Sequence, residues 1–161
     1  MGSLTAAAEA RLLAVDLAGA ERYLEEKWHA YPVEGGRSQR LAVVAGFALA
    51  NLYCDEGRWE EAEAVLAVHR REPGGGHVEA RLAAHRGRFE EALALARRTV
   101  EAKERTDELD RRAARWVVLA EVQPAVGLSA EAGESVERAL RLYERKGNAA
   151  AIERARATAA T

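Results

Sequence analysis

Apolar residues recur along most of this chain at intervals of three and four positions, the spacing that places them on one face of an α-helix. Only three prolines interrupt the pattern, and proline is the residue that breaks helices most strongly. The periodicity and its glycine and proline breaks predict helices over residues 4–14, 17–29, 38–56, 59–71, 77–86, 89–105, 108–125, 129–146 and 148–159. An all-α fold follows from this pattern.

The same order of residue types is repeated along the chain. An apolar helical stripe is followed by a glycine, by an aromatic residue two positions later and by an alanine three positions further on. Two complete copies are formed by Gly57, Trp59 and Ala62 and by Gly87, Phe89 and Ala92. A third copy keeps Gly127 and Ala132 but has a serine at the aromatic position, and an earlier copy near residues 10–20 is degraded.

Each member of the repeat has a physical role in a helix hairpin. Glycine takes the positive φ that ends a helix and reverses the chain. The alanine is small enough to let two helices approach closely. A single helix pair cannot bury its own apolar stripe, so neighbouring pairs must stack into a solenoid with a concave and a convex face.

The repeated pattern resembles the tetratricopeptide repeat, through Leu49, Ala50, Tyr53, Gly57, Trp59, Ala62 and Leu66. The family period is about 34 residues, whereas the glycine spacings here are 30 and 40. The resemblance implies a right-handed superhelix of antiparallel helix pairs. We therefore expect one domain over residues 1–161, with repeats at roughly 4–30, 38–72, 77–105 and 108–146 and a capping helix at 148–159.

The charge and cysteine content limit the cellular compartment and the classes of binding partner that we expect for this chain. The formal net charge is -2, and acidic and basic residues are interspersed. The sequence therefore has no concentration of basic residues of the kind that binds nucleic acid or anionic lipid. No apolar run approaches the roughly 20 residues of a membrane span. Cys54 is the only cysteine and cannot form an internal disulfide. We expect a cytoplasmic protein that binds neither nucleic acid nor membrane directly.

Several residue groups could suggest catalysis, but each has a simpler explanation. His77, Arg81 and His85 share a helix face, yet the arginine between the histidines would repel a metal cation. The adjacent carboxylates Glu60 and Glu61 point about 100° apart on a helix, so they cannot act on one bond. Residues 74–76 are glycine-rich but lack the Gly-Lys-Ser/Thr ending of a phosphate loop. The sequence thus predicts a non-enzyme without cofactor or metal.

Binding is the remaining kind of function, and the resemblance implies where it occurs. The inner helices of a tetratricopeptide superhelix line its concave groove, which corresponds here to Phe47, Asn51, Cys54, Asp55, His77, Arg81, His85, Val117 and Glu121. We expect this groove to bind a peptide or a partner domain. The chain is also similar to the repeat regions of bacterial MalT-like and LuxR-type regulators, which implies a role in signalling or transcriptional regulation. The alternative is an effector domain that senses a small-molecule inducer.

Overall fold

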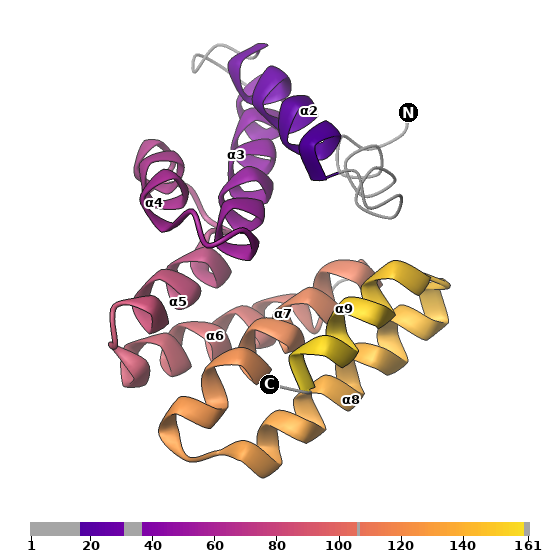
Figure 1. Cartoon of the computed structure of the whole chain (residues 1–161). Helices are drawn as coiled ribbons and strands as arrows, with labels where there is room; N and C mark the ends of the chain where they lie inside the picture. Colours follow the sequence, from indigo (N-terminus) through magenta and orange to yellow (C-terminus); the bar gives the residue numbers. More distant parts are fainter. Residues whose placement is uncertain (1–16, 31–36, 106, 160–161) are drawn as a thin grey trace. The chain divides into compact units, whose positions relative to one another are not determined.

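A computed structural model describes residues 17–30, 37–105 and 107–159 of the chain. Every regular element within these ranges is helical, which confirms the all-α prediction (Figure 1). The elements are α2 (Leu17–Ala30), α3 (Arg37–Asp55), α4 (Trp59–Val68), α5 (Gly76–His85), α6 (Phe89–Lys103), α7 (Leu109–Val122), the 3-10 helix η1 (Gln123–Val126), α8 (Ser129–Lys146) and α9 (Ala149–Ala159). The helix expected at 4–14 lies outside the described residues.

Two helices, α4 and α7, end three residues earlier than the sequence predicted. α4 ends at Val68, because the chain turns at His69, whose amide donates to the carbonyl of Leu66 at 3.0 Å and whose side chain is buried. α7 ends at Val122 and tightens into η1, which has Pro124 in its first turn. Proline has no amide hydrogen to continue the α-helical ladder, and a tighter 3-10 turn is a common way for a helix to end.

The three predicted glycine turns are confirmed by their backbone geometry. Gly57, Gly87 and Gly127 have φ values of +72°, +74° and +81°. The residue after each glycine donates its amide to the carbonyl five positions earlier: Arg58 to Tyr53 at 2.8 Å, Arg88 to Ala83 at 2.9 Å and Leu128 to Gln123 at 3.0 Å. This is the Schellman arrangement that closes a helix end. Gly147 repeats it between α8 and α9, with φ +78°.

The chain divides into two compact units, one up to Val78 and one from Glu79 onward, with the division inside α5. In the first unit α3 contacts both α2 and α4. Its core is formed by side chains from these three helices, among them Ala20, Leu24, Leu49, Leu52, Tyr53, Ala62, Val65 and Leu66. Leu49 and Ala62 are fully buried, as the close approach expected at Ala62 requires.

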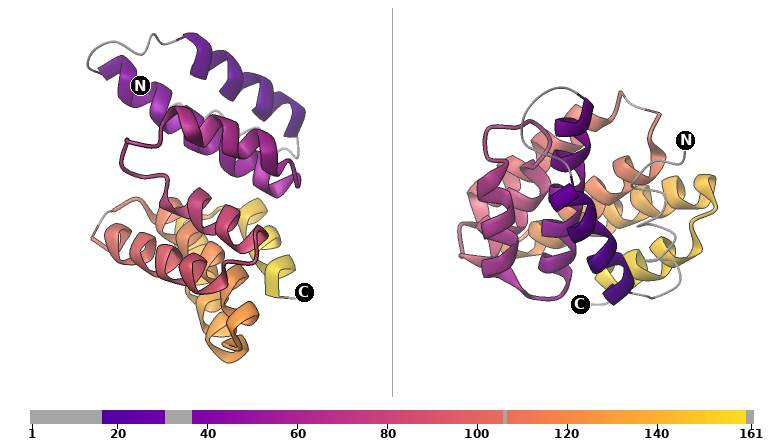
Figure 2. Two further views of the ribbon diagram at one scale, coloured as in Figure 1. Left: turned by 90° about the vertical axis from the view of Figure 1, so that its left-hand side faces the viewer. Right: turned by 90° about the horizontal axis from the view of Figure 1, so that it is seen from above.

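The second unit is built around α7, which contacts α6 and α8, while α9 packs against α8 and α7 (Figure 2). One core cluster joins α5, α6 and α7 through Ala80, Ala83, Ala92, Leu93, Ala96, Val100, Val118, Leu119 and Val122. A second cluster joins α7, α8 and α9 through Ala113, Ala139, Leu142, Tyr143, Ala151 and Ala155. Trp116 packs against both clusters, so α7 connects the two parts of this core.

Candidate functional site

The structure brings two of the predicted binding residues together in the second unit. Nε of Arg81 on α5 lies 3.1 Å from Oε2 of Glu121 on α7, and their side chains are 10% and 32% exposed. His85, one helical turn after Arg81, is exposed, and Val117, one turn before Glu121, is half-buried. We call these four residues the α5/α7 surface. It joins the first helices of two consecutive hairpins.

The predicted binding residues of the first unit differ in their exposure. Asn51 is half-buried and Asp55 is exposed, both on α3. Three other residues are buried: the exposed fraction is 7% for Phe47, 3% for Cys54 and 5% for His77. Little of these three side chains is open to a partner in this structure, and their part in a binding surface stays a prediction.

Phe47 is buried because it covers the glycine-rich loop before α5. A Cβ atom on Gly75 would lie 2.8 Å from Cε1 of Phe47 and 3.1 Å from Cδ1 of Leu66, which is too close for any side chain there. The same loop satisfies His77, whose Nδ1 lies 3.1 Å from the carbonyl oxygen of Gly74. The glycines of this loop thus make room for core packing.

A polar contact inside the first unit joins His69 to a residue 41 positions earlier, which no pattern in the sequence predicts. Nε1 of Trp28 donates a hydrogen bond to Nε2 of His69 at 2.8 Å. The imidazole also stands edge-on to Phe47, with ring centroids 6.0 Å apart. Gly46 also lies against the imidazole, because an added Cβ there would come within 2.6 Å of Cδ2 of His69. We call Trp28, Gly46, Phe47 and His69 the His69 cluster.

The His69 cluster favours the neutral imidazole. Burial lowers the pKa of His69, and the nearby carboxylate of Glu72 opposes that shift only in part. Because Nε2 accepts the indole proton, the neutral ring carries its own proton on Nδ1. A second proton could be added only at Nε2, which would break the bond to Trp28.

Acidification is expected to destabilise the protein through His69. A histidine whose folded pKa is below its unfolded value stabilises the fold fully above the unfolded value, about 6.5, and this stabilisation is lost as the pH falls through the folded pKa. Urea unfolding followed by tryptophan fluorescence between about pH 7.5 and pH 5 should show the loss. His69→Gln should remove that part of the pH dependence. A variant with the same pH profile as the original chain would contradict this assignment.

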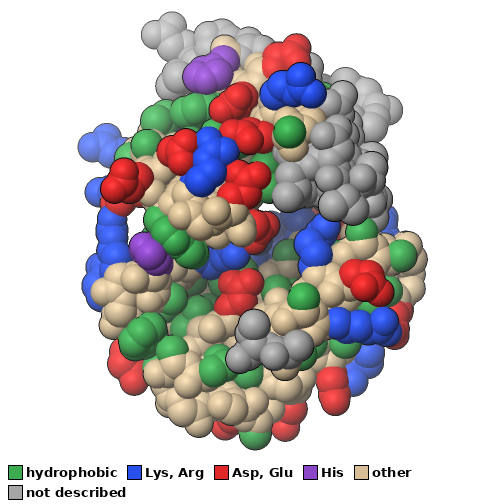
Figure 3. Space-filling view, in the orientation of Figure 1, with side chains coloured by type: hydrophobic (Ala, Val, Ile, Leu, Met, Phe, Trp, Pro, Cys, Tyr) green, Lys and Arg blue, Asp and Glu red, His purple; other side chains and the backbone are tan. Residues whose placement is uncertain are grey.

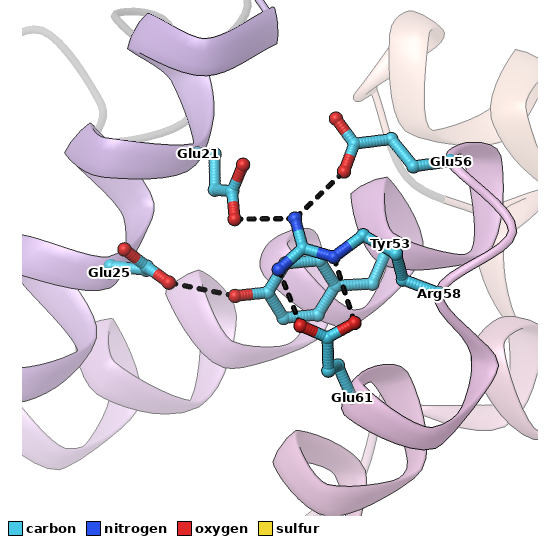
Figure 4. Close-up of polar contacts among 6 residues, drawn as sticks. All are labelled: Glu21, Glu25, Tyr53, Glu56, Arg58 and Glu61. Carbon is cyan, nitrogen blue, oxygen red and sulfur yellow. Dashed lines mark hydrogen bonds and ion pairs between the residues drawn. The ribbon is translucent and has the colours of Figure 1, made fainter.

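A second polar network in the first unit is centred on Arg58 (Figure 4). Its guanidinium pairs with Glu61 through two contacts of 2.8 and 2.6 Å and with Glu21 and Glu56 at 2.6 and 2.9 Å. These carboxylates belong to α4, α2 and the turn after α3. Hydrogen bonds to these three carboxylates raise the pKa of Arg58, so the network holds a permanent positive charge between three segments.

Tyr53 extends this network through contacts with Arg58 and Glu25. The Arg58 guanidinium lies 4.2 Å from the centre of the Tyr53 ring, within the range of a cation–π contact. The hydroxyl of Tyr53 donates to Oε1 of Glu25 at 2.8 Å. Burial and this hydrogen bond both raise the pKa of Tyr53, so it stays a neutral donor. The arrangement tethers α2 to the α3/α4 hairpin.

The described part of the chain contains no group of three His, Cys, Asp or Glu side chains placed to hold a metal ion. None of the described helices has the length and apolarity to cross a bilayer. On the face visible in Figure 3, acidic and basic side chains alternate over the surface. Comparison of the chain with protein-family models, with curated proteins and with solved structures finds no match.

Proposed function

We propose that this chain is a non-catalytic interaction module that binds a peptide or a partner domain through the α5/α7 surface. The helix pairs would form a right-handed superhelix of the tetratricopeptide type. Its setting would be the cytoplasm, in a bacterial signalling or transcriptional regulatory protein, as the sequence resemblance implies. Binding would not involve nucleic acid or membrane.

The observation that carries this proposal is the contact between Arg81 and Glu121. It makes α5 and α7 neighbours, although α6 separates them in sequence. In stacked helix pairs, the first helices of successive pairs line the surface that binds partners. The contact between Arg81 on α5 and Glu121 on α7 brings two such first helices together, as a surface of this kind requires.

The chemistry of the α5/α7 surface also suits protein recognition. Glu121 orients the Arg81 guanidinium, and most of that side chain is already shielded from water. A partner therefore meets an arginine that loses little conformational freedom on binding. Arginine is among the residues that contribute most to interface energies when water is excluded around it. Half-buried Val117 adds an apolar contact, so the surface fits a segment that carries both apolar and charged side chains.

Substitution of Arg81 tests the proposal. The partner would be isolated with the full chain as bait, and its Kd measured by calorimetry for the original chain and for Arg81→Ala. We expect a loss of tenfold or more, because truncating an arginine anchor typically costs about 2 kcal/mol. Asn51→Ala, on α3, tests separately whether the first unit takes part.

Arg97→Ala is the matched control, because Arg97 is an exposed arginine on α6. Its substitution should leave the affinity unchanged, and circular dichroism would show that each variant is folded. Equal affinities for Arg81→Ala and Arg97→Ala would place the binding surface elsewhere. Saturable binding of a small metabolite with no protein partner would instead support an inducer-sensing domain.

A further inference from the structure

Polar contacts attach α2 to the α3/α4 hairpin in two places, one in each half of the helix. In the first half, Oε1 of Glu21 lies 2.6 Å from Nη1 of Arg58 (Figure 4). In the second half, the indole of Trp28 donates to His69 at 2.8 Å. Arg58 directly precedes α4 and His69 directly follows it. The two halves of α2 are therefore fixed beside opposite ends of α4.

The two attachments differ in how they respond to acid. In the first half the donors are Arg58 and the hydroxyl of Tyr53, which bonds to Glu25 at 2.8 Å. The pKa values of both donors are raised, so both keep their protons at neutral and weakly acidic pH. In the second half the roles are reversed, because His69 is the acceptor for the proton of Trp28. An imidazole nitrogen loses its capacity to accept once it is protonated.

The surroundings of the His69 ring do not suit an imidazolium. Nε2 faces the N–H group of Trp28, and a Cβ added to Gly46 would lie 2.7 Å from the same nitrogen. The ring of Phe47 lies edge-on, with centroids 6.0 Å apart. An imidazolium carries an N–H group on both nitrogens, and a buried charge that cannot form its hydrogen bonds costs free energy. Protonation therefore favours a displaced ring.

Two other titratable side chains lie close to this cluster. Glu72, in the turn after α4, donates its amide to the carbonyl of His69 at 2.9 Å, and its carboxylate raises the pKa of His69. His29 on α2 is exposed, with its ring centroid 4.7 Å from that of Trp28. The arginines at 70 and 71 are exposed, and α3 contributes no charged side chain to the His69 cluster. A displaced imidazolium thus has a carboxylate in its own turn.

We propose that His69 is a pH-sensitive switch, whose protonation releases the second half of α2 from the α3/α4 hairpin. The imidazolium breaks the hydrogen bond from Trp28 and turns toward Glu72 and solvent. The contacts of Glu21 and Glu25 keep the first half of α2 in place. Acidification then opens one segment of the first unit locally, before the unit as a whole unfolds.

Hydrogen exchange measured by NMR on the full chain tests the switch. The indole proton of Trp28, assigned by comparison with Trp28→Phe, should lose protection about tenfold or more between about pH 7.5 and pH 5. A tenfold change corresponds to about 1.4 kcal/mol, close to the net contribution of one hydrogen bond. Low concentrations of urea should leave this exchange unchanged but accelerate that of the amide of buried Leu49, because sensitivity to denaturant increases with the surface that an opening exposes.

Three variants assign the effect to His69. Glutamine in His69→Gln offers an oxygen that can accept the indole proton and does not titrate, so the protection of Trp28 should no longer depend on pH. Glu72→Gln removes the carboxylate that favours the imidazolium and should move the transition to lower pH, which keeps the test valid if His69→Gln does not fold. His29→Gln is the matched control, because it removes the exposed histidine beside the same indole, and its transition should equal that of the original chain.

The switch is overturned if the protection of Trp28 is the same at both pH values, if its loss persists in folded His69→Gln, or if its loss disappears in His29→Gln. Equal urea dependence for the exchange of Trp28 and Leu49 would show that acid acts through global unfolding alone. That result would also overturn the switch, but it would leave the loss of stability predicted above for His69 intact.

Discussion

Replacing Leu49 with alanine is expected to lower the free energy of unfolding by about 2 to 5 kcal/mol, the range found when a leucine is truncated in a packed core. Leu49 is fully buried on α3, the helix that contacts both α2 and α4. The substitution removes apolar contacts and leaves a cavity that these three helices can close only in part. Equilibrium urea unfolding followed by circular dichroism measures the change.

Val68→Ala is the comparison for this substitution. Val68 lies at the end of α4 and is 58% exposed, so its truncation should change the free energy of unfolding by no more than about 0.5 kcal/mol. Similar losses at Leu49 and Val68 would show that the packing of α3 described above is wrong.

Replacing Gly46 with alanine is expected to cost about 2 to 3 kcal/mol, although alanine is the better helix former by about 1 kcal/mol. The new Cβ would lie 2.6 Å from Cδ2 and 2.7 Å from Nε2 of His69. Such overpacking typically costs 1 to 3 kcal/mol. The displaced imidazole would also lose the hydrogen bond from Trp28, which leaves buried donor and acceptor groups unsatisfied at about 1 to 3 kcal/mol.

Two further variants separate these effects. Gly133 is also within a helix, α8, and an added Cβ there meets no atom within 4 Å, so Gly133→Ala should stabilise the protein by up to about 1 kcal/mol. In a His69→Ala background the obstructing ring is gone, and Gly46→Ala should cost little. Additive losses in the double variant would mean that Gly46 does not act through His69.

The all-α fold and the glycine turns could be predicted because their causes are local. Positive φ at Gly57, Gly87 and Gly127 depends on the residue itself and on the few hydrogen bonds around it. The same is true at the start of α9, where Oδ1 of Asn148 accepts the amide hydrogen of Ala151 at 3.1 Å. Each of these features is determined by five or six consecutive residues, so a short stretch of sequence is enough to predict it.

The candidate site could be predicted only in part, because its contacts join distant positions. The spacing of His77, Arg81 and His85 correctly placed them on one helix, but periodicity does not say which face is covered by other elements. His77 is buried while His85 is exposed. The bond from Trp28 to His69 spans 41 residues, and no pattern within either helix indicates it.

The Schellman turns have a consequence for how this chain tolerates evolutionary change. Each turn is closed by hydrogen bonds between residues no more than five positions apart, so its geometry does not depend on the length of the helices on either side. The glycines of these four turns, at 57, 87, 127 and 147, are separated by 30, 40 and 20 residues, yet the turns are alike. Insertion or deletion in a helix between them would leave the hydrogen bonds of each turn in place. The turn geometry is therefore compatible with helices of different lengths on either side of it.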